Sequence, residues 1–278
     1  MQPDRSGAHA VRIGDVRAFW QEHPVCAAAI PHAPGTPEYF TAFDRLRAEL
    51  EPPDFARRLY EWDRAAGERV LDVGCGNGFV LSGYARHGAR TVGVDLTESA
   101  AALSRRRFAL AGLPGAFAVA NAEALPFPDQ SFDRVCSMGV LHHTPDTARA
   151  VAEIHRVLRR GGRLLVMLYH RNSARYRFKI PLLRWRTRRS TRELVNEVDG
   201  AGNPKGEVYS RRELARLLRD FTALELFAGG LSPQEVFPTR FVHGQGLVPR
   251  VGGPLARALL RPLEPRIGWF LYAKGRKP

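Results

Sequence analysis

The chain has 278 residues, of which 25% are charged and 44% hydrophobic, and it carries a formal net charge of +14. This composition fits a globular protein with a sizeable core and excludes collagenous and disordered chains. No apolar run reaches the roughly 18 residues of a membrane-spanning helix, and the polar first twenty residues contain no secretory signal. Cys26, Cys75 and Cys136 are widely spaced, which favours a reduced, cytoplasmic protein without a cysteine-based metal site.

The positive charge is concentrated towards the end of the sequence. Residues 171–278 contain 22 basic and nine acidic side chains, whereas residues 1–69 contain nine basic and 11 acidic ones. Most of the excess is arginine. A solvated basic face and a surface that binds anions would both give this pattern, and charge alone does not choose between them.

Prolines divide the first part of the chain into short helical segments. Apolar residues at helical spacing predict a helix over 37–50. A second helix is expected to begin with Asp54 as its N-cap and to be ended by Gly67. Together these segments are expected to form a helical cap over residues 1–68.

From residue 69 onward, strands alternate with helices. Short and nearly continuous apolar runs indicate strands buried on both faces of a parallel sheet. The predicted strands are 69–73, 91–95, 116–120, 133–138, 163–169, 221–227 and 267–273, and the predicted helices are 78–87, 98–111, 145–160 and 211–219. In the helix 145–160, Thr144 is expected to be the N-cap, and Gly161 is expected to follow the last turn. The alternation predicts an α/β fold with a doubly wound sheet.

The alternation of strands and helices is interrupted after residue 170. We expect a ligand-binding core at 69–170, followed by a basic lid insertion at 171–209. Residues 210–278 are expected to complete the sheet, with a second insertion at 229–265.

A glycine-rich loop follows the first strand of the core. Gly74, Gly76 and Gly78 allow a tight turn and a close approach of a ligand to the main chain. A dinucleotide loop would have its third glycine at position 79, where Phe79 stands, and the lysine of a phosphate loop is absent. The carboxylate of Asp72 within the strand would attract a cationic ligand and repel a pyrophosphate.

Asp95 ends the second strand, 21 residues after Gly74. An acid at this place can accept both hydroxyl groups of an adenosine ribose. A solvent-facing aspartate at a strand end is the alternative, and the glycine loop upstream favours ribose binding.

Several motifs together resemble those of the class I S-adenosylmethionine-dependent methyltransferases. They are DVGCGNG at 72–78, GVD at 93–95, AEALPFPDQSFDRVCSMGVLHH at 122–143 and EIHRVLRRGGRLLV at 153–166. The similarity covers residues 69–170 and is greatest to the small-molecule branch called methyltransferase type 11. It implies a mostly parallel, seven-stranded, Rossmann-like sheet with N-terminal helices and a C-terminal lid insertion, and S-adenosyl-L-methionine as the cofactor.

The same resemblance implies which residues contact the cofactor. Asp72 and the glycine loop would hold the methionine end, Asp95 the ribose and Leu96 the adenine. Asn121 stands where many relatives have aspartate, and its amide can still donate to and accept from the adenine edge. The full set implied is Asp72, Gly74, Cys75, Gly76, Asn77, Gly78, Asp95, Leu96, Asn121, Ala122, Glu123, Met138 and Gly139.

Methyl transfer depends mainly on aligning the nucleophile, the methyl carbon and the sulfur. A base is needed only if the acceptor starts out protonated. His142, His143 and Tyr169, at the ends of the fourth and fifth strands, are the candidate catalytic residues. The alternative is structural: histidines bonded to a neighbouring loop and a packed tyrosine. Histidines and cysteines are too scattered to predict a metal site.

Residues 175–192 interleave arginines with aromatic and aliphatic side chains. They could form a lid that grips an anionic acceptor, an interfacial segment on an anionic membrane surface, or a nucleic-acid patch. Insertions after the fifth strand usually build the acceptor lid in the family that this chain resembles, so the lid is favoured. The membrane surface stays open as a partner, and nucleic acid is disfavoured.

We therefore expect a cytoplasmic enzyme that transfers a methyl group to an oxygen, nitrogen or carbon atom of a small, hydrophobic or anionic molecule. One alternative is a methyltransferase that acts on RNA or on a membrane-associated lipid or quinone. A non-catalytic cofactor-binding protein is the other, and the intact glycine loop and Asp95 argue against it. The oligomeric state is left open.

Overall fold

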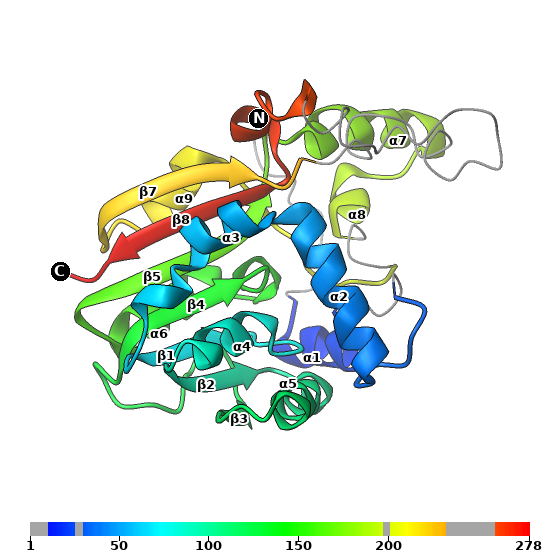
Figure 1. The fold of residues 1–278 in the computed structure, drawn as a ribbon. Coiled ribbons are helices and arrows are strands. Elements are labelled where there is room, and N and C mark those ends of the chain that lie inside the picture. Colours follow the sequence, from blue (N-terminus) through cyan, green and yellow to red (C-terminus); the bar gives the residue numbers. More distant parts are fainter. Residues whose placement is uncertain (1–10, 26–29, 197–200, 232–258) are drawn as a thin grey trace.

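A mostly parallel β-sheet runs through the centre of the protein (Figure 1). The computed structural model describes residues 11–25, 30–196, 201–231 and 259–278. Its strands are β1 (Arg69–Val73), β2 (Arg90–Asp95), β3 (Ala116–Val119), β4 (Phe132–Met138), β5 (Leu158–His170), β6 (Val208–Tyr209), β7 (Thr222–Gly229) and β8 (Phe270–Arg276). Their order is β3-β2-β1-β4-β5-β8-β7, and β8 runs antiparallel to both neighbours. The predicted doubly wound, mostly parallel α/β fold is confirmed, but the described sheet has eight strands and not seven, because β6 pairs with β5 beside this path.

Helices cover both faces of the sheet. They are α1 (Ile13–Glu22), α2 (Pro37–Leu50), α3 (Pro53–Tyr60), η2 (Trp62–Arg64), α4 (Phe79–Arg86), α5 (Glu98–Ala111), η3 (Leu141–His143), α6 (Thr147–Val157), η4 (Arg175–Lys179), α7 (Ile180–Thr187), α8 (Thr191–Asn196), α9 (Arg211–Leu217) and α12 (Glu264–Ile267). Apolar side chains of α3, α4 and α5 pack on one face, and those of α6 and α9 pack on the other.

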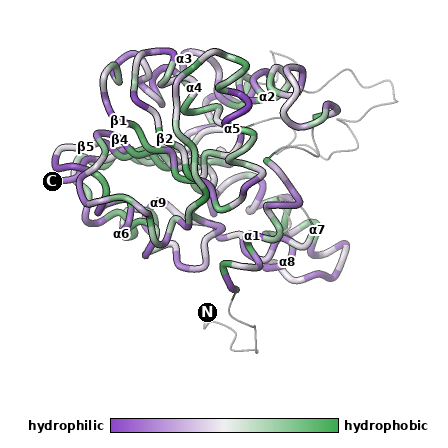
Figure 2. The backbone as a smooth tube through the Cα atoms, turned by 90° about the horizontal axis from the view of Figure 1, so that it is seen from below, coloured by the Kyte–Doolittle hydropathy of each residue, from purple (hydrophilic) through white to green (hydrophobic). Residues whose placement is uncertain are grey.

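The strand β5 shows how the core forms on both sides of the sheet. Leu164, Val166 and Leu168 belong to the apolar cluster with α6 and α9, while Leu165 and Met167 belong to the cluster with α3 and α4. Successive side chains of a strand point to opposite faces, so a continuous apolar run serves both clusters. Figure 2 shows hydrophobic residues gathered along the central strands.

The strand β6 differs from the sequence-based expectation, which places no strand within 171–209. It pairs in parallel with the end of β5, with Tyr169 opposite Val208 and His170 opposite Tyr209. Two residues are too few to give a period of two in the sequence, so the pattern could not reveal this strand. The pairing ties the end of the insertion to the sheet.

The predicted helix over 145–160 is too long at both ends. Asp146, not Thr144, is the N-cap, and its side chain accepts a hydrogen bond from the amide of Arg149 at 2.9 Å. The helix ends at Val157, and Leu158 already belongs to β5, where it pairs with β4. Residues 158–162, which the sequence predicts as the last turn of the helix and its glycine stop, therefore belong to β5. Pairing with β4 overrides their local helix propensity.

The predicted caps of α3 also need correction. Pro52 occupies the N-cap position, which leaves Asp54 inside the first turn. The helix ends at Tyr60 because Glu61 adopts the left-handed region at φ 50°, well before Gly67. The Tyr60 ring then stacks on Trp62 with centroids 4.7 Å apart.

The basic insertion contains η4, α7, α8 and β6, and the second insertion at 229–265 lies largely outside the described residues. In Figure 1, α7 and α8 lie beyond the end of the sheet to which the parallel strands point. Among the residues that the structure describes, no helix is both long and apolar enough to span a membrane.

Candidate active site

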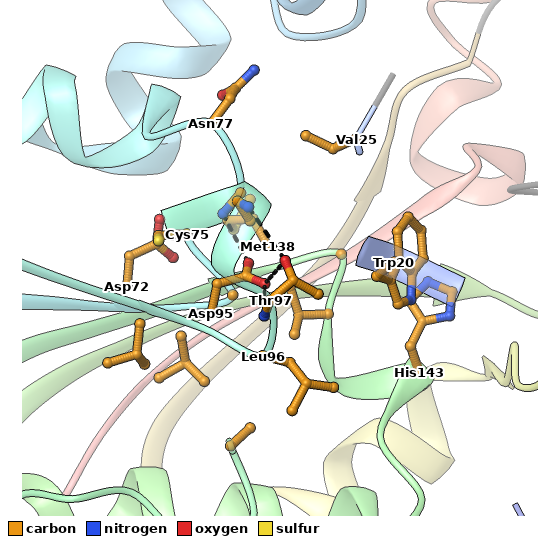
Figure 3. A pocket seen from close by; sticks show the side chains of 18 of the residues that line it. Trp20, Val25, Asp72, Cys75, Asn77, Asp95, Leu96, Thr97, Met138 and His143 are labelled. Atoms are coloured by element: carbon orange, nitrogen blue, oxygen red, sulfur yellow. Dashed lines mark hydrogen bonds between the residues drawn. The ribbon is translucent and has the colours of Figure 1, made fainter. Parts of the chain in front are cut away.

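A pocket opens at the edge of the sheet where β1, β2 and β4 end. It encloses about 1140 Å³ of empty space, including its open mouth. Its walls come from the glycine loop after β1, the end of β2, the turns after β3 and β4, and the helices α1 and α2. Figure 3 shows Asp72 and Asp95 on one side of this pocket, Trp20 and His143 on the other, and Met138 between them.

The glycine loop is held tightly against neighbouring segments. Gly74 has φ +84°, and a Cβ atom there would come within 2.2 Å of the Val140 side chain. The amide of Gly76 donates to Asp95 Oδ2 at 3.1 Å, which joins the loop to the end of β2. A side chain at position 74 would therefore separate the loop from the segment that follows β4.

Asp72 is a buried carboxylate without a full set of partners. It is 2% exposed, and its Oδ1 has no hydrogen-bond partner among the described residues. Burial, together with the nearby charge of Asp95, raises its pKa well above the ordinary value, and Arg47 opposes this rise. A cationic ligand in the pocket would compensate the buried charge.

Arg47 on α2 lines the pocket and was not found from the sequence. Its Nη2 lies 2.7 Å from Glu51 and donates to the Tyr60 hydroxyl at 2.9 Å, while its buried Nε has no partner among the described residues. In the sequence, Arg47 is one of two arginines on an amphipathic helix, so nothing there marks it as a pocket residue.

Asp95 is bound on both carboxylate oxygens. Oδ1 accepts from the amide and the hydroxyl of Thr97, both at 3.0 Å, and Oδ2 accepts from Gly76. Burial raises the pKa of Asp95, and these hydrogen bonds counteract the rise. Because a carboxylate offers about four acceptor directions, these bonds leave at most one for a ligand hydroxyl, fewer than the two ribose hydroxyls that the sequence-based prediction assigns to Asp95.

Most of the other residues expected to bind the cofactor also line the pocket. They are Gly74, Cys75, Gly76, Asn77, Leu96, Asn121, Ala122, Met138 and Gly139. Gly78 and Glu123 are not among the lining residues. Gly78 is the N-cap of α4 in the left-handed region, and Glu123 Oε1 accepts from the amide of Asp146 at the start of α6. Burial raises the pKa of the Cys75 thiol, so this side chain stays protonated at neutral pH.

Of the three candidate catalytic residues, His143 is the one that lines the pocket. Its Nδ1 lies 2.7 Å from the carbonyl oxygen of Lys205, so Nδ1 must be the donor and Nε2 carries the lone pair of the neutral ring. The Trp20 ring lies edge-on to it at a centroid distance of 5.0 Å. This geometry sets the tautomer that a general base at Nε2 requires.

His142 and Tyr169 lie behind His143. The His142 side chain is fully buried, and its two ring nitrogens have no hydrogen-bond partner among the described residues. Burial, with His143 and Lys205 adding to it, lowers the pKa of His142 well below the ordinary value. The centroid of the His142 ring lies 4.1 Å from that of His143 and 4.0 Å from that of Tyr169. The rings of His142 and Tyr169 therefore pack behind His143 and support its position.

The helix α1 is a further part of the wall that the sequence did not indicate. Ile13, Val16 and Trp20 line the pocket from this helix, and Pro24 and Val25 line it just beyond. The Trp20 ring, for example, contacts His143 from a distant part of the sequence, and no local pattern could predict such a contact. The described residues contain no group of three histidine, cysteine or acidic side chains placed to hold a metal ion.

The strand order, with its last antiparallel strand between β5 and β7, and the pocket at the ends of β1 and β2 define the class I methyltransferase fold. A solved structure from Streptomyces coelicolor A3(2), geranyl diphosphate C-methyltransferase, has the same fold with a TM-score of 0.60. The two structures align over 96% of this chain and 98% of the Streptomyces chain, with 16% sequence identity.

Within that class, residues 71–166 match the family model described as "Methyltransferase domain". This match agrees with the resemblance that the motifs carry, and it covers residues 71–166. The chain is 35% identical over 115 residues to a ubiquinone biosynthesis O-methyltransferase from Alkalilimnicola ehrlichii, covering 41% of this chain and 47% of that protein. It is 40% identical over 113 residues to methyltransferase GfsG from Streptomyces halstedii, covering 39% and 41%. The chain thus matches about half or less of the length of these relatives.

Proposed function

We propose that this protein transfers the methyl group of S-adenosyl-L-methionine to a small hydrophobic or anionic acceptor. The observation that carries this proposal is one continuous pocket with two buried carboxylates at one end and His143 with Trp20 at the other. Such a pocket offers an acidic end for a cationic nucleoside and a separate end for the acceptor.

The charge of the pocket favours this cofactor over a dinucleotide. Among the lining side chains, Asp72 and Asp95 have a formal charge of −2 and Arg47 of +1, with histidine counted as neutral. Because burial raises the pKa of both carboxyl groups, a bound cation would stabilise their ionised forms. Glu51, which pairs with Arg47, makes the surroundings more negative. S-adenosylmethionine bears one net positive charge, whereas the pyrophosphate of a dinucleotide is negative and would be repelled.

The residues present fit this cofactor. The free Oδ1 of Asp72 would accept from the ammonium group, and the free Nε of Arg47 would donate to the carboxylate of the same amino-acid end. Asp95 would accept from a ribose hydroxyl, and Leu96 and Ala122 would pack on the adenine. The cofactor, when bound, supplies a methyl group that its sulfonium already activates, so the protein's task is alignment.

His143 is the residue that we propose as general base. Its Nδ1 proton is fixed by the Lys205 carbonyl, which presents Nε2 as the basic atom. A base contributes when the acceptor atom is a protonated oxygen or nitrogen, and positioning alone serves an acceptor that is already a nucleophile.

The names of similar proteins support a lipophilic or anionic acceptor. One curated relative is named for ubiquinone biosynthesis, and the solved neighbour was crystallised with geranyl diphosphate. We propose that residues 171–209 form the lid over such an acceptor, supported by the pairing of β6 with the end of β5. A cytoplasmic location is also a proposal, supported by Cys75 and Cys136, which are buried as free thiols.

The test is incubation of the protein with methyl-labelled cofactor and a host extract, followed by separation into lipids, small metabolites, RNA and protein. We expect label in the small-metabolite or lipid fraction, and much less label with the Asp72→Asn variant at a cofactor concentration below saturation. Label in the RNA fraction would mean that the acceptor is a nucleic acid and not a small molecule. Equal label with the wild type and the Asp72→Asn variant would contradict enzymatic transfer from this pocket.

A further inference from the structure

An exposed row of apolar side chains runs along η4 and α7. Phe178 is 63% exposed, Leu182 is 48% exposed and Trp185 is 80% exposed. Their spacing of four and then three residues places them on one side of the helical segment. Large apolar side chains that gather on an exposed surface mark a place of contact with a partner.

The same segment carries a large excess of positive charge. Residues 171–196 contain nine basic side chains and one acidic side chain, Glu193. Arg177, Arg184 and Arg186 are exposed, and within the described part of the chain they form no ion pair. The apolar row is therefore flanked by positive charge that no acidic side chain of the described segments neutralises.

We propose that this face docks α7 onto the surface of an anionic phospholipid membrane. The apolar row would enter the boundary between headgroups and acyl chains, and the arginines would lie on lipid phosphates. The helical segment 175–187 is too short to cross a bilayer, so it would lie in the plane of the surface. This inference goes beyond the proposed methyl transfer and does not depend on it.

The docking face belongs to the end of the molecule that holds the pocket. The Arg175 guanidinium lies 3.6 Å from the centroid of the Trp269 ring, Trp269 stacks on Tyr169 at 5.1 Å, and Tyr169 lies 6.0 Å from His143. Figure 1 places α7 beyond the ends of the parallel strands, at the outer margin of the molecule. If the methyl transfer is correct, a docked protein could therefore take a lipophilic acceptor from the membrane.

Nucleic acid is the competing partner for a basic and aromatic surface. Stacking on bases requires aromatic or guanidinium planes, and Leu182 in the centre of the row offers neither. An aliphatic side chain between two aromatic ones, with charge on both flanks, fits the depth of a lipid headgroup layer better. The membrane is therefore the occupant that this surface favours.

The experiment is flotation of the full chain with lipid vesicles. Vesicles of phosphatidylcholine with about one third phosphatidylglycerol are compared with vesicles of phosphatidylcholine alone, at low and at high salt. We expect binding to the anionic vesicles at low salt, weaker binding at high salt, and little binding to the neutral vesicles. Absence of binding to anionic vesicles at low salt would overturn the proposal without any variant.

Two sets of variants separate the two parts of the face. Arg177→Gln, Arg184→Gln and Arg186→Gln together should lower partitioning onto anionic vesicles by about a hundredfold, since each basic side chain contributes roughly a fivefold factor. Phe178→Ser with Trp185→Ser should lower it by on the order of tenfold or more.

Matched controls change the same residue types on other surfaces. Arg90→Gln, Arg106→Gln and Arg160→Gln are the charge control, and Leu110→Ser with Val119→Ser is the apolar control, because all five side chains are exposed away from α7. The proposal requires the controls to bind vesicles like the wild type. All variants should keep the wild-type affinity for S-adenosylmethionine, which separates a failure of docking from a failure of the proposed function.

A parallel titration with single-stranded RNA decides between the two partners. If the variants of the face lose RNA binding and keep wild-type vesicle binding, the surface is a nucleic-acid site and the proposal fails. Equal vesicle binding by the control and the face variants would also overturn it. Loss of vesicle binding confined to the face variants supports it.

Discussion

Asp72 shows what a ligand site demands of single residues. Its carboxylate is buried with one oxygen lacking a partner, and burial raises its pKa. In the unfolded chain this group ionises at an ordinary pKa, so folding becomes less favourable as the pH rises from that value through the raised one. The cost persists at neutral pH, and a bound cationic cofactor would offset it by stabilising the ionised carboxylate.

Asp72→Asn should therefore stabilise the free protein and weaken cofactor binding. The gain in unfolding free energy should be larger at pH 8 than at pH 4, because the unfolded wild type releases this proton at an ordinary pKa while burial makes the folded protein hold it. The affinity for S-adenosylmethionine should fall more than tenfold, since a charge-assisted bond is lost. Urea unfolding and calorimetry measure the two effects, with the exposed Asp63→Asn as the control. A variant that is less stable than the wild type at pH 8 would refute this account of Asp72.

His143→Gln should lower the rate of transfer to a protonated oxygen or nitrogen acceptor by about 10²–10⁴-fold, because Nε2 no longer accepts the proton. Cofactor affinity should change less than about twofold, since the expected cofactor contacts lie at the other end of the pocket. His155→Gln on α6 is the control, as its ring packs on Phe221 outside the pocket. A transfer rate for His143→Gln equal to that of the wild type would remove the role of base.

At the scale of residues, the sequence could reveal those parts of the site that lie next to a motif. Asp72, Gly74 and Asp95 stand at strand ends that local spacing predicts, and the fold brings them to one pocket. Arg47 and Trp20 line the same pocket from helices whose contacts with the sheet depend on tertiary packing. No local pattern encodes such packing, so these residues could be found only in the structure.

At the scale of elements, α1 acts as a separate wall. It buries Val16 and Phe19, and the Ser99 amide donates to Gln21 at 3.4 Å, yet none of its residues belongs to the apolar clusters on the two faces of the sheet. A wall attached in this way can be removed with little loss of core stability.

Removal of residues 1–23 should leave the core folded and weaken cofactor binding by roughly tenfold, because the pocket loses the apolar side chains of α1. Far-ultraviolet circular dichroism and calorimetry measure these two quantities. Loss of cooperative unfolding would mean that α1 is part of the core, and unchanged affinity would mean that it does not close the site.

Elements were predictable where one physical signal dominates. The helices at 37–50 and 98–111 have the bounds that apolar spacing and caps indicate, because no other interaction competes for their ends. The helix α6 is shorter than predicted because Leu158 and the residues after it form β5, which pairs with β4. β6 consists of two residues whose only reason to be extended is the neighbouring β5. Both differences come from pairing between distant segments.

At the scale of the whole molecule, the two proposed binding sites differ in charge. The pocket has a negative lining, while the basic excess lies in the last part of the chain and on α7. Opposite fields at neighbouring places can attract a cationic cofactor to one and an anionic surface to the other. Both proposed interactions, cofactor binding in the pocket and membrane docking through α7, thus lie at the edge of the sheet where the parallel strands end.

The central claim is that S-adenosylmethionine lies along this edge with its ribose on Asp95, and titration calorimetry of the full chain tests it most directly. We expect saturable binding at one site per chain, and a drop in affinity of about tenfold or more for Asp95→Asn, because that variant loses a charged acceptor of hydroxyl hydrogen bonds. No heat of binding with the wild type, or the same affinity in the variant, would contradict the account.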